Sequence, residues 1–162
     1  MIDIVNFSGE MFELGYEKIY NLSNFNIAYG SKDNRRIIAN RKVDILVSPE
    51  REMASRSLTA INSGLNEAIC KIASKNDIAI GISFHDILKS NNKPAAIARV
   101  MQNVRLCRKY KVRMMMASFA SNKYEMRHAK DMLNFCLVLG MNDGEAKEAL
   151  SFKKKEEKIR FV

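Results

Sequence analysis

Residues that could carry out acid–base or metal chemistry are scarce in this chain of 162 residues. It contains two histidines, His85 and His128, and three widely spaced cysteines that form no C-x-x-C motif and are expected to be buried. A metal-dependent phosphoesterase needs several histidines and carboxylates that converge on one site, so this composition argues against one. The chain has no Walker lysine loop, G-x-G-x-x-G or G-x-S-x-G motif, and no histidine is placed to activate Ser48 or Ser118. We therefore predict no catalytic residue and no metal site in the chain itself.

Basic residues are a stronger signal, because 27 lysines and arginines against 18 acidic residues give a net charge of +9. Residues 95–130 hold nine basic residues and one acid, and residues 31–56 hold seven basic residues and four acids. Arginine is the commoner cation in both segments, and its planar guanidinium suits bidentate contact with phosphate. The two segments predict an RNA or DNA partner that is held through its shape and backbone charge. Tyr124 and Phe119 border the first segment, where core packing is the favoured role and stacking on bases the alternative.

Short apolar runs of strand length predict the elements that position these residues: 2–6, 18–22, 26–29, 43–47, 78–83 and 113–118. Several runs are apolar at nearly every position, which is typical of parallel strands covered on both faces. Apolar residues recur at helical spacing in residues 65–72, 97–104 and 126–137. Gly140 is expected to end the third of these helices, and Asp143 to cap a short last helix through Leu150. This alternation predicts an α/β fold with parallel strands.

The N-terminal third departs from this scheme. Only Ser23, Asn24 and Phe25 separate the runs 18–22 and 26–29, whereas a parallel crossover needs about a dozen residues. Either the two runs form an antiparallel hairpin or a repeat unit is absent between them. We expect one domain over residues 1–152 and a charged tail over 153–162. With no apolar run of about 20 residues and no signal-peptide pattern, the expected location is the cytoplasm.

A series of motifs agrees in order and spacing with one known family. The motifs are VDILVSP at 43–49, NSGLNEAICK at 62–71, IAIGISF at 78–84, NVRLCRKYKV at 103–112, SFA at 118–120, Arg127 with Asp131, and LGM at 139–141. Together they resemble the archaeal ribonuclease P protein component 3 family, which is related to the human thirty-kilodalton subunit. The resemblance covers about residues 26–152.

The resemblance implies a TIM-barrel-like, parallel β/α barrel of the PHP-related superfamily, without that superfamily's metal site. The short N-terminal connections indicate a trimmed, incomplete barrel with about six strands. The implied function is that of a protein subunit of ribonuclease P, the endoribonuclease whose RNA subunit uses magnesium to remove the 5′ leader from precursor tRNA. The chain alone is then non-catalytic and binds no cofactor. Its implied partners are the ribonuclease P RNA, a small protein subunit with which it pairs, the other protein subunits, and precursor tRNA as substrate of the assembly; no membrane is involved.

Family positions tied to RNA or partner binding fall on Arg36, on Arg51 or Arg56, on Lys75 and on Arg127. Combined with the basic segments, they give a predicted RNA-binding set: Arg35, Arg36, Arg51, Arg56, Lys75, Arg99, Arg105, Arg108, Lys109, Arg127 and Lys130. Two alternatives stay open at this point. One is a freestanding metal-dependent phosphoesterase of the PHP type, and the other is a basic ribosomal or nucleic-acid-binding module.

Overall fold

The computed structural model describes residues 1–40, 42–53 and 61–152. Within them lie six strands: β1 (Ile2–Val5), β2 (Lys18–Asn21), β3 (Ile27–Tyr29), β4 (Ile45–Val47), β5 (Ala79–Ser83) and β6 (Met114–Ala117). The helices are α1 (Asn34–Ala39), α2 (Glu67–Asn76), α3 (Phe84–Lys89), α4 (Lys93–Tyr110), α5 (Ala129–Val138) and α6 (Asp143–Ala149), with short 3₁₀ turns η1 (Leu22–Asn24) and η2 (Lys123–Glu125). Each strand lies within an apolar run that predicted it.

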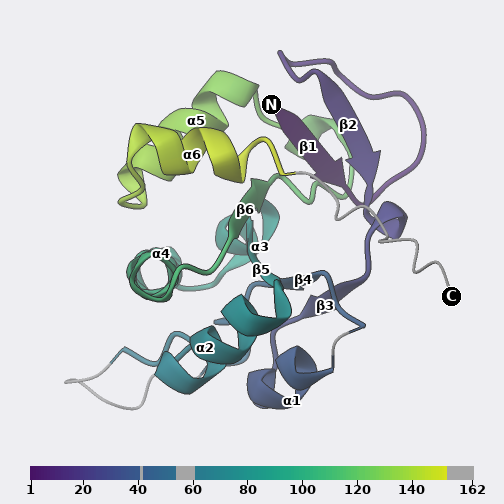
Figure 1. Ribbon diagram of the computed structural model, residues 1–162. Coiled ribbons are helices and arrows are strands. Elements are labelled where there is room, and N and C mark those ends of the chain that lie inside the picture. The colour runs from purple at the N-terminus through teal and green to yellow at the C-terminus, as the bar shows by residue number, and fades with distance from the viewer. Residues whose placement is uncertain (41, 54–60, 153–162) are drawn as a thin grey trace, which may run out of the picture.

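All strand pairs are parallel. β1 pairs with β2, and β3, β4, β5 and β6 form a second sheet in chain order. In Figure 1 the strands follow an arc, with the helices packed on its outer side. The fold is thus α/β with parallel sheets and alternating strands and helices, as the sequence predicted.

The two sheets meet where β1 runs beside the residues that follow β6. The amide of Phe119 donates to the carbonyl oxygen of Ile4 at 2.9 Å, and the amide of Asn6 donates to the carbonyl oxygen of Ala120 at 2.8 Å. β1 therefore continues the order of the second sheet beyond β6.

The short connection at Ser23–Phe25 is resolved in favour of parallel pairing. β2 pairs with β1 and β3 pairs with β4, so in the part of the chain that the structure describes they form no antiparallel hairpin. The chain passes from one sheet to the other through η1, which Asn21 caps by accepting a hydrogen bond from the amide of Ser23. The connection between β1 and β2 spans residues 6–17 without a helix, close to the minimum length for a parallel crossover.

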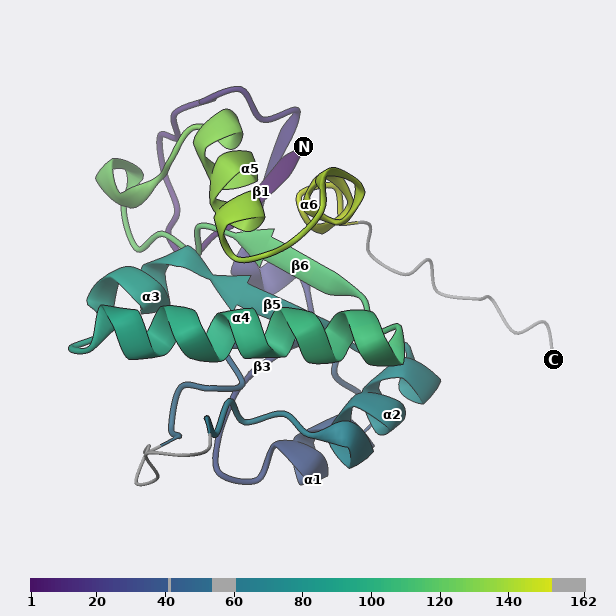
Figure 2. The same ribbon diagram turned by 90° about the vertical axis from the view of Figure 1, so that its left-hand side faces the viewer.

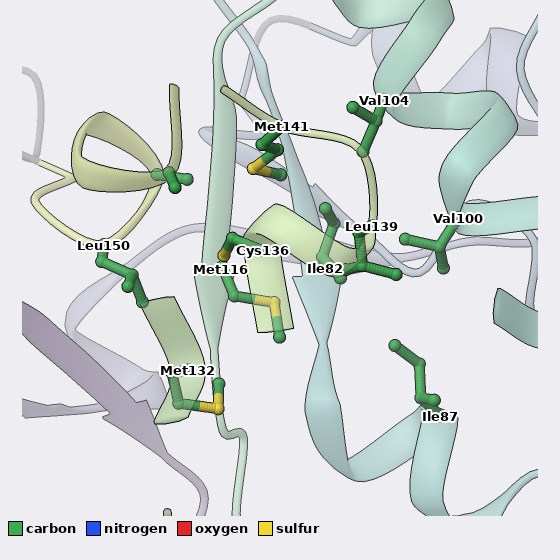
Figure 3. Packing of buried hydrophobic residues seen from close by; sticks show 12 residues of the cluster. Ile82, Ile87, Val100, Val104, Met116, Met132, Cys136, Leu139, Met141 and Leu150 are labelled. Carbon is green, nitrogen blue, oxygen red and sulfur yellow. The ribbon is translucent and has the colours of Figure 1, made fainter. Parts of the chain in front are cut away.

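Apolar side chains cover both faces of the sheets. The inner face is one cluster to which all six strands contribute, including Ile4, Tyr20, Ile27, Ile45, Ala79 and Met115. Space there is tight, because a Cβ on Gly81 would approach the Cγ2 atoms of Ile45 and Val47 to 2.9 Å. The outer face packs against the helices; Figure 3 shows Ile82 and Met116 meeting Val100, Met132 and Leu139. Burying a side chain of this size contributes roughly 1.5–3 kcal/mol, so both faces stabilise the fold.

Local signals set the helix ends. α4 has 18 residues and begins at the N-cap Asn92, so it extends for about 27 Å along the sheet. Figure 2 shows its first turns beside α3 and its last turns beside α2. Gly140 adopts a φ of +93° just after α5, as expected, whereas the N-cap of α6 is Asn142 and not Asp143. Asn142 forms a reciprocal capping box with Glu145, which explains the shift by one residue.

All three cysteines, Cys70, Cys107 and Cys136, are buried and free. Burial raises the pKa of Cys70 to about 11 and that of Cys136 to about 12, so these thiols stay protonated near neutral pH. Among the helices that the structure describes, none has the length and hydropathy needed to cross a membrane.

Candidate nucleic-acid interface and ligand cavity

A cavity of about 470 Å³ lies where β4 and β5 end. We call it the β4–β5 cavity. Its lining comes from the segment after β4, from α3 and from the start of α4: Ser48, Glu50, Arg51, Asp86, Ile87, Lys89, Ser90, Asn91, Asn92, Ala96 and Arg99. A smaller hollow of about 240 Å³ adjoins it and shares Arg51 and Asp86. The carboxyl ends of parallel strands are the usual place for a site in α/β proteins, so the fold places these side chains where function is expected.

A buried asparagine fixes the segment that follows β4. The Nδ2 atom of Asn34 donates to the carbonyl oxygens of Pro49 at 2.8 Å and Gly64 at 2.9 Å. Gly64 has a φ of +79°, and a Cβ there would lie 1.9 Å from the Pro49 carbonyl oxygen. Only glycine fits this contact, which holds the residues lining the cavity to the start of α1.

Ser48 and Ser118, the two serines considered as nucleophiles, each form a hydrogen bond with a carboxylate. The Oγ atom of Ser48 donates to Oδ2 of Asp86 at 2.6 Å, and the Oγ atom of Ser118 donates to Oδ2 of Asp3 at 2.6 Å. His85 instead contacts Glu125, with 2.9 Å between Nδ1 and Oε2. Neither serine thus pairs with a histidine, and neither arrangement provides an activated nucleophile. Sequence reasoning missed the carboxylate partners because they lie 38 and 115 residues away.

Glu50 is a buried acid in the wall of the β4–β5 cavity. It is 8% exposed, and its Oε2 atom accepts a hydrogen bond from Nδ2 of Asn103 at 3.0 Å. Burial raises the pKa of Glu50 to about 7, an effect that Asp86 reinforces and that Asn103 and Arg99 oppose. The Oδ1 atom of Asn103 has no hydrogen-bond partner among the described residues.

Two arginines of the predicted set, Arg51 and Arg99, line this cavity. The guanidinium carbon of Arg51 lies 5.1 Å from the centre of the Tyr29 ring, and Arg99 is half-buried on α4. Among the described residues neither arginine forms an ion pair with a carboxylate. Lys89, which was not predicted, also lines the cavity, and its Nζ atom lies 3.1 Å from Oε1 of Glu125.

Glu125 connects the cavity rim to the turn at η2. Its Oε2 atom accepts from the amide of Ser121 at 2.9 Å. Hydrogen bonds from that amide, from Lys89 and from His85 lower the pKa of Glu125 to about 2. The Glu125 carboxylate therefore stays ionised and orders the three groups around it. In the sequence, Glu125 stood out only as the single acid of a basic segment.

The remaining predicted cations are spread over the outer surface. Exposed positions are taken by Arg35 and Arg36 on α1, Lys75 on α2, Arg105 and Lys109 on α4, and Lys130 on α5. Arg56 lies outside the described residues. Arg127 is half-buried, 5.6 Å from the centre of the Phe84 ring, and donates to the carbonyl oxygens of Tyr124 and Met126. Arg108 is exposed but donates to both carboxylate oxygens of Glu145, at 2.7 and 2.6 Å, and to the carbonyl oxygen of Gly140.

The basic segment 95–130 is therefore not one patch in space. α4 carries Arg99 to the carboxyl ends of the strands and Arg108 to the opposite end, where Arg113 precedes β6. Of the two aromatic candidates, Phe119 is 3% exposed and packs in the inner cluster, as predicted. Tyr124 is 76% exposed and belongs to no core cluster, so core packing was the wrong role for it. Its ring stands edge-on to Phe12 at 6.3 Å, with the Nζ atom of Lys123 5.5 Å from its centre.

Over residues 1–40, 42–53 and 61–152, no group of three or more histidine, cysteine, aspartate or glutamate side chains is placed to hold a metal ion. The fold and the site thus define a parallel α/β protein with a cation-lined cavity at its strand ends. The family model "RNase P subunit p30" matches residues 27–156, and the chain belongs to this family. The resemblance inferred from the motifs is confirmed.

Relatives of known name agree with this assignment. The chain is 33% identical over 129 residues to Ribonuclease P protein component 3 of Methanosarcina mazei, a match that covers 77% of this chain and 51% of the relative. It is 31% identical over 119 residues to the protein of the same name from Thermococcus gammatolerans, covering 72% of this chain and 52% of the relative. The chain therefore spans about half the length of these relatives.

A solved structure shares the fold. A chain of the cryo-EM structure of archaeal Ribonuclease P with mature tRNA superposes with a TM-score of 0.72 at 20% sequence identity. The match covers 93% of this chain and 87% of that chain. At this identity the likeness establishes the shared α/β architecture.

Proposed function

We propose that the chain is a protein subunit of ribonuclease P, which binds and supports the RNA subunit that removes the 5′ leader from precursor tRNA. The family match over residues 27–156 carries this proposal, together with relatives named Ribonuclease P protein component 3. The net charge of +9 and the arginines at the strand ends support it, because they suit a phosphate-rich partner. We place its action in the cytoplasm.

In this proposal the RNA carries out the chemistry and the protein supplies cationic support. Hydrolysis of a phosphodiester usually relies on metal ions that position the nucleophile and neutralise the leaving oxygen. We assign the magnesium to the RNA subunit and no cofactor to the protein. Lysines and arginines offset the repulsion between phosphates, so the RNA reaches its active fold at a lower magnesium concentration.

We further propose that the six strands form an incomplete TIM-like barrel that is open between β2 and β3. The hydrogen bonds from Phe119 to Ile4 and from Asn6 to Ala120 support continuity between β6 and β1. The inner cluster supports it too, because every strand contributes a side chain. A barrel of this kind has its functional site at the carboxyl ends of the strands, which is where we place the RNA.

The proposed RNA contacts are the predicted set apart from Arg108, whose charge is paired with Glu145, and Arg51, Arg99 and Arg127 form their centre. These three lie at or near the carboxyl ends of the strands and have no carboxylate partner among the described residues. The exposed cations on α1, α2, α4 and α5 extend the contact outward. We also propose that the chain pairs with a small protein subunit of the assembly and meets precursor tRNA as the substrate of that assembly.

One experiment tests the proposal directly. The tagged chain is captured from cells of its source, and the bound RNA is sequenced. Enrichment of a single structured RNA with the sequence of ribonuclease P RNA is expected, whereas broad recovery of ribosomal RNA would favour a general RNA-binding module.

Reconstitution tests the division of labour. The purified chain should not cleave precursor tRNA with or without magnesium. Added to the RNA and its small partner subunit, it should lower the magnesium that the RNA requires. Arg36→Ala combined with Arg127→Ala should raise that requirement again, and His85→Ala should leave the rate nearly unchanged. Cleavage by the isolated chain that is lost in His85→Ala would overturn the proposal.

A further inference from the structure

The β4–β5 cavity holds two guanidinium groups, from Arg51 and Arg99, that form no ion pair with a carboxylate within the described residues. From this we propose that the cavity is a binding site for a phosphate group that belongs to a nucleotide. The site goes beyond electrostatic contact over the surface, because it selects one nucleotide in a defined pocket.

The position of Arg99 is the first observation that favours an anion. A half-buried guanidinium loses part of its hydration and is ordinarily compensated by a carboxylate. Neither acid of the cavity forms an ion pair with Arg99 within the described residues. Asp86 accepts the Ser48 hydroxyl at 2.6 Å, and Glu50 accepts the Asn103 amide at 3.0 Å. A phosphate between Arg51 and Arg99 would supply the missing partner in the bidentate geometry that guanidinium favours.

The start of α4 adds a second, independent source of positive potential. Asn91, Asn92 and Ala96 line the cavity, so the first turn of this 18-residue helix faces it. No acidic residue lies in that turn, whereas α2, α5 and α6 each carry one or more acids in theirs. The Asn92 side chain already accepts from the amide of Ala95, and Pro94 has no amide hydrogen. The helix end therefore contributes the partial positive charge of its dipole, which no acidic side chain of that turn offsets, and not a set of free amides.

The acids of the cavity do not make it a cation site. Burial raises the pKa of Glu50 to about 7, so near neutral pH this group carries only part of a negative charge. Asp86 contributes one carboxylate against Arg51, Arg99 and Lys89, and Lys89 is shared with Glu125. The balance of charge in the cavity is positive.

The volume of about 470 Å³ lies within the usual range of about 300–1,000 Å³ for small-ligand sites and admits one nucleotide. The phosphate has two sources of the same chemistry. It comes from an RNA strand that inserts a nucleotide into the cavity, or from a free mononucleotide. The RNA source rests on the proposed function, and the mononucleotide source does not.

Titration calorimetry on the full chain at low salt tests the site with two probes. One probe is adenosine 5′-monophosphate, and the other is a single-stranded uridine hexanucleotide with hydroxyl groups at both ends. We expect Arg99→Gln and Arg51→Gln each to weaken the probe that binds by about tenfold, the usual effect of losing one charge-assisted hydrogen bond. Binding of the hexanucleotide alone identifies the RNA source, and binding of the mononucleotide identifies the free source.

Two further variants keep the result interpretable. Lys147→Gln removes a cation on α6, away from the cavity, and should change affinity by less than about twofold because that charge is already paired with Asp143. Asp86→Asn keeps an acceptor for Ser48 but removes a negative charge, so it should strengthen binding by about threefold. Arg51 is exposed, so its variant is expected to fold even if Arg99→Gln does not.

The proposal is overturned if neither probe binds, if both arginine variants bind as the wild type does, or if Asp86→Asn weakens binding. If the chain captures ribonuclease P RNA in cells but binds neither probe, the proposed phosphate site is refuted and the proposed function remains intact.

Discussion

Among the described residues, arginines form ion pairs with carboxylates at the amino end of the parallel sheets, whereas the arginines at the carboxyl end do not. At the amino end of β6, Arg108 holds Glu145 through two hydrogen bonds, and Arg113 lies 2.7 Å from Asp77. At the carboxyl end, Arg51 and Arg99 face a cavity without such a partner among the described residues. The acids respond accordingly: Arg108 lowers the pKa of Glu145, whereas burial raises that of Glu50 to about 7.

This difference separates cations that stabilise the fold from cations that are available to a ligand. The charge of Arg108 is satisfied within the chain, and its bonds join α4 to α6. Within the described residues, Arg51 lies against the Tyr29 ring and Arg99 acts on Glu50, but neither forms an ion pair with a carboxylate. Arg99 and Arg108 belong to the same basic segment of the sequence, so the structure is needed to tell them apart.

The largest expected effect concerns Glu50. Its pKa is raised from the ordinary 4.5 to about 7, so between these values the folded state binds more protons than the unfolded state. Stability therefore falls as pH rises through this window, and the full cost of burying the charge is present above pH 7. Glu50→Gln should be nearly neutral at pH 5 and should stabilise the protein at pH 8 by on the order of 2 kcal/mol. Urea denaturation at the two pH values measures this.

A matched control is available two positions further on. Glu52→Gln makes the same chemical change at an exposed position and should alter stability by less than about 0.5 kcal/mol at either pH. Asp3 is buried and its pKa is raised as well, so it adds pH dependence of the same sign to every variant. If Glu50→Gln shows the same stability difference at pH 5 and pH 8, the buried charge is not the cause.

Tyr124 lies on η2, after β6, and adds an exposed aromatic ring near the carboxyl end of the sheets. A ring that is 76% exposed beside Lys123 can stack on an unpaired base, a contact that contributes about 1–3 kcal/mol. Tyr124→Ala should therefore weaken binding of single-stranded RNA by about tenfold without changing the dependence on salt. Tyr124→Phe retains the ring and should bind as the wild type does. Fluorescence anisotropy at several salt concentrations measures both the affinity and its salt dependence. An equal loss of affinity in both variants would exclude stacking.

Substitution of Arg127 should change the salt dependence of RNA binding, which substitution of Tyr124 should not. The Arg127 guanidinium is held by the carbonyl oxygens of Tyr124 and Met126 and lies against Phe84, so it is ordered before a ligand arrives. Arg127→Ala should weaken RNA binding and reduce the slope of log affinity against log salt by about 0.7, the value for one phosphate contact on a single strand. An unchanged slope would remove Arg127 from the interface.

The sequence predicted the fold better than the site, for a physical reason. Runs such as 43–47 and 78–83 are apolar on both faces, and β4 and β5 are buried throughout, so strand type and parallel pairing follow from composition. The motifs also led to the correct family. The helix α3 was not predicted, because its six residues are too short to show a helical period.

The site depends on contacts between distant residues, which no local pattern reveals. Glu50 meets Asn103 across 53 positions, and Ser48 meets Asp86 across 38. The segment 95–130 has the highest positive charge in the sequence, yet α4 divides it between the two ends of the sheets. Polar residues just after a predicted parallel strand, such as Ser48 and Glu50 after β4, were the local signals that could have marked the cavity.

The smallest expected effect is that of substituting Arg108. This substitution tests whether the paired end of the molecule serves stability and not binding. The bidentate pair of Arg108 with Glu145 is exposed to solvent, so screening limits it to roughly 0.5–1 kcal/mol of stability. Arg108→Gln should lower the free energy of unfolding by about that amount, and Glu145→Gln should do the same. A double-mutant cycle should show that the two losses are not additive, because both remove one interaction. Binding of single-stranded RNA by Arg108→Gln should stay within about twofold of the wild type, since the guanidinium is already occupied. A loss of RNA affinity as large as that in Arg127→Ala would show that the pair opens to bind phosphate, and the paired and unpaired ends of the molecule would then not differ in function.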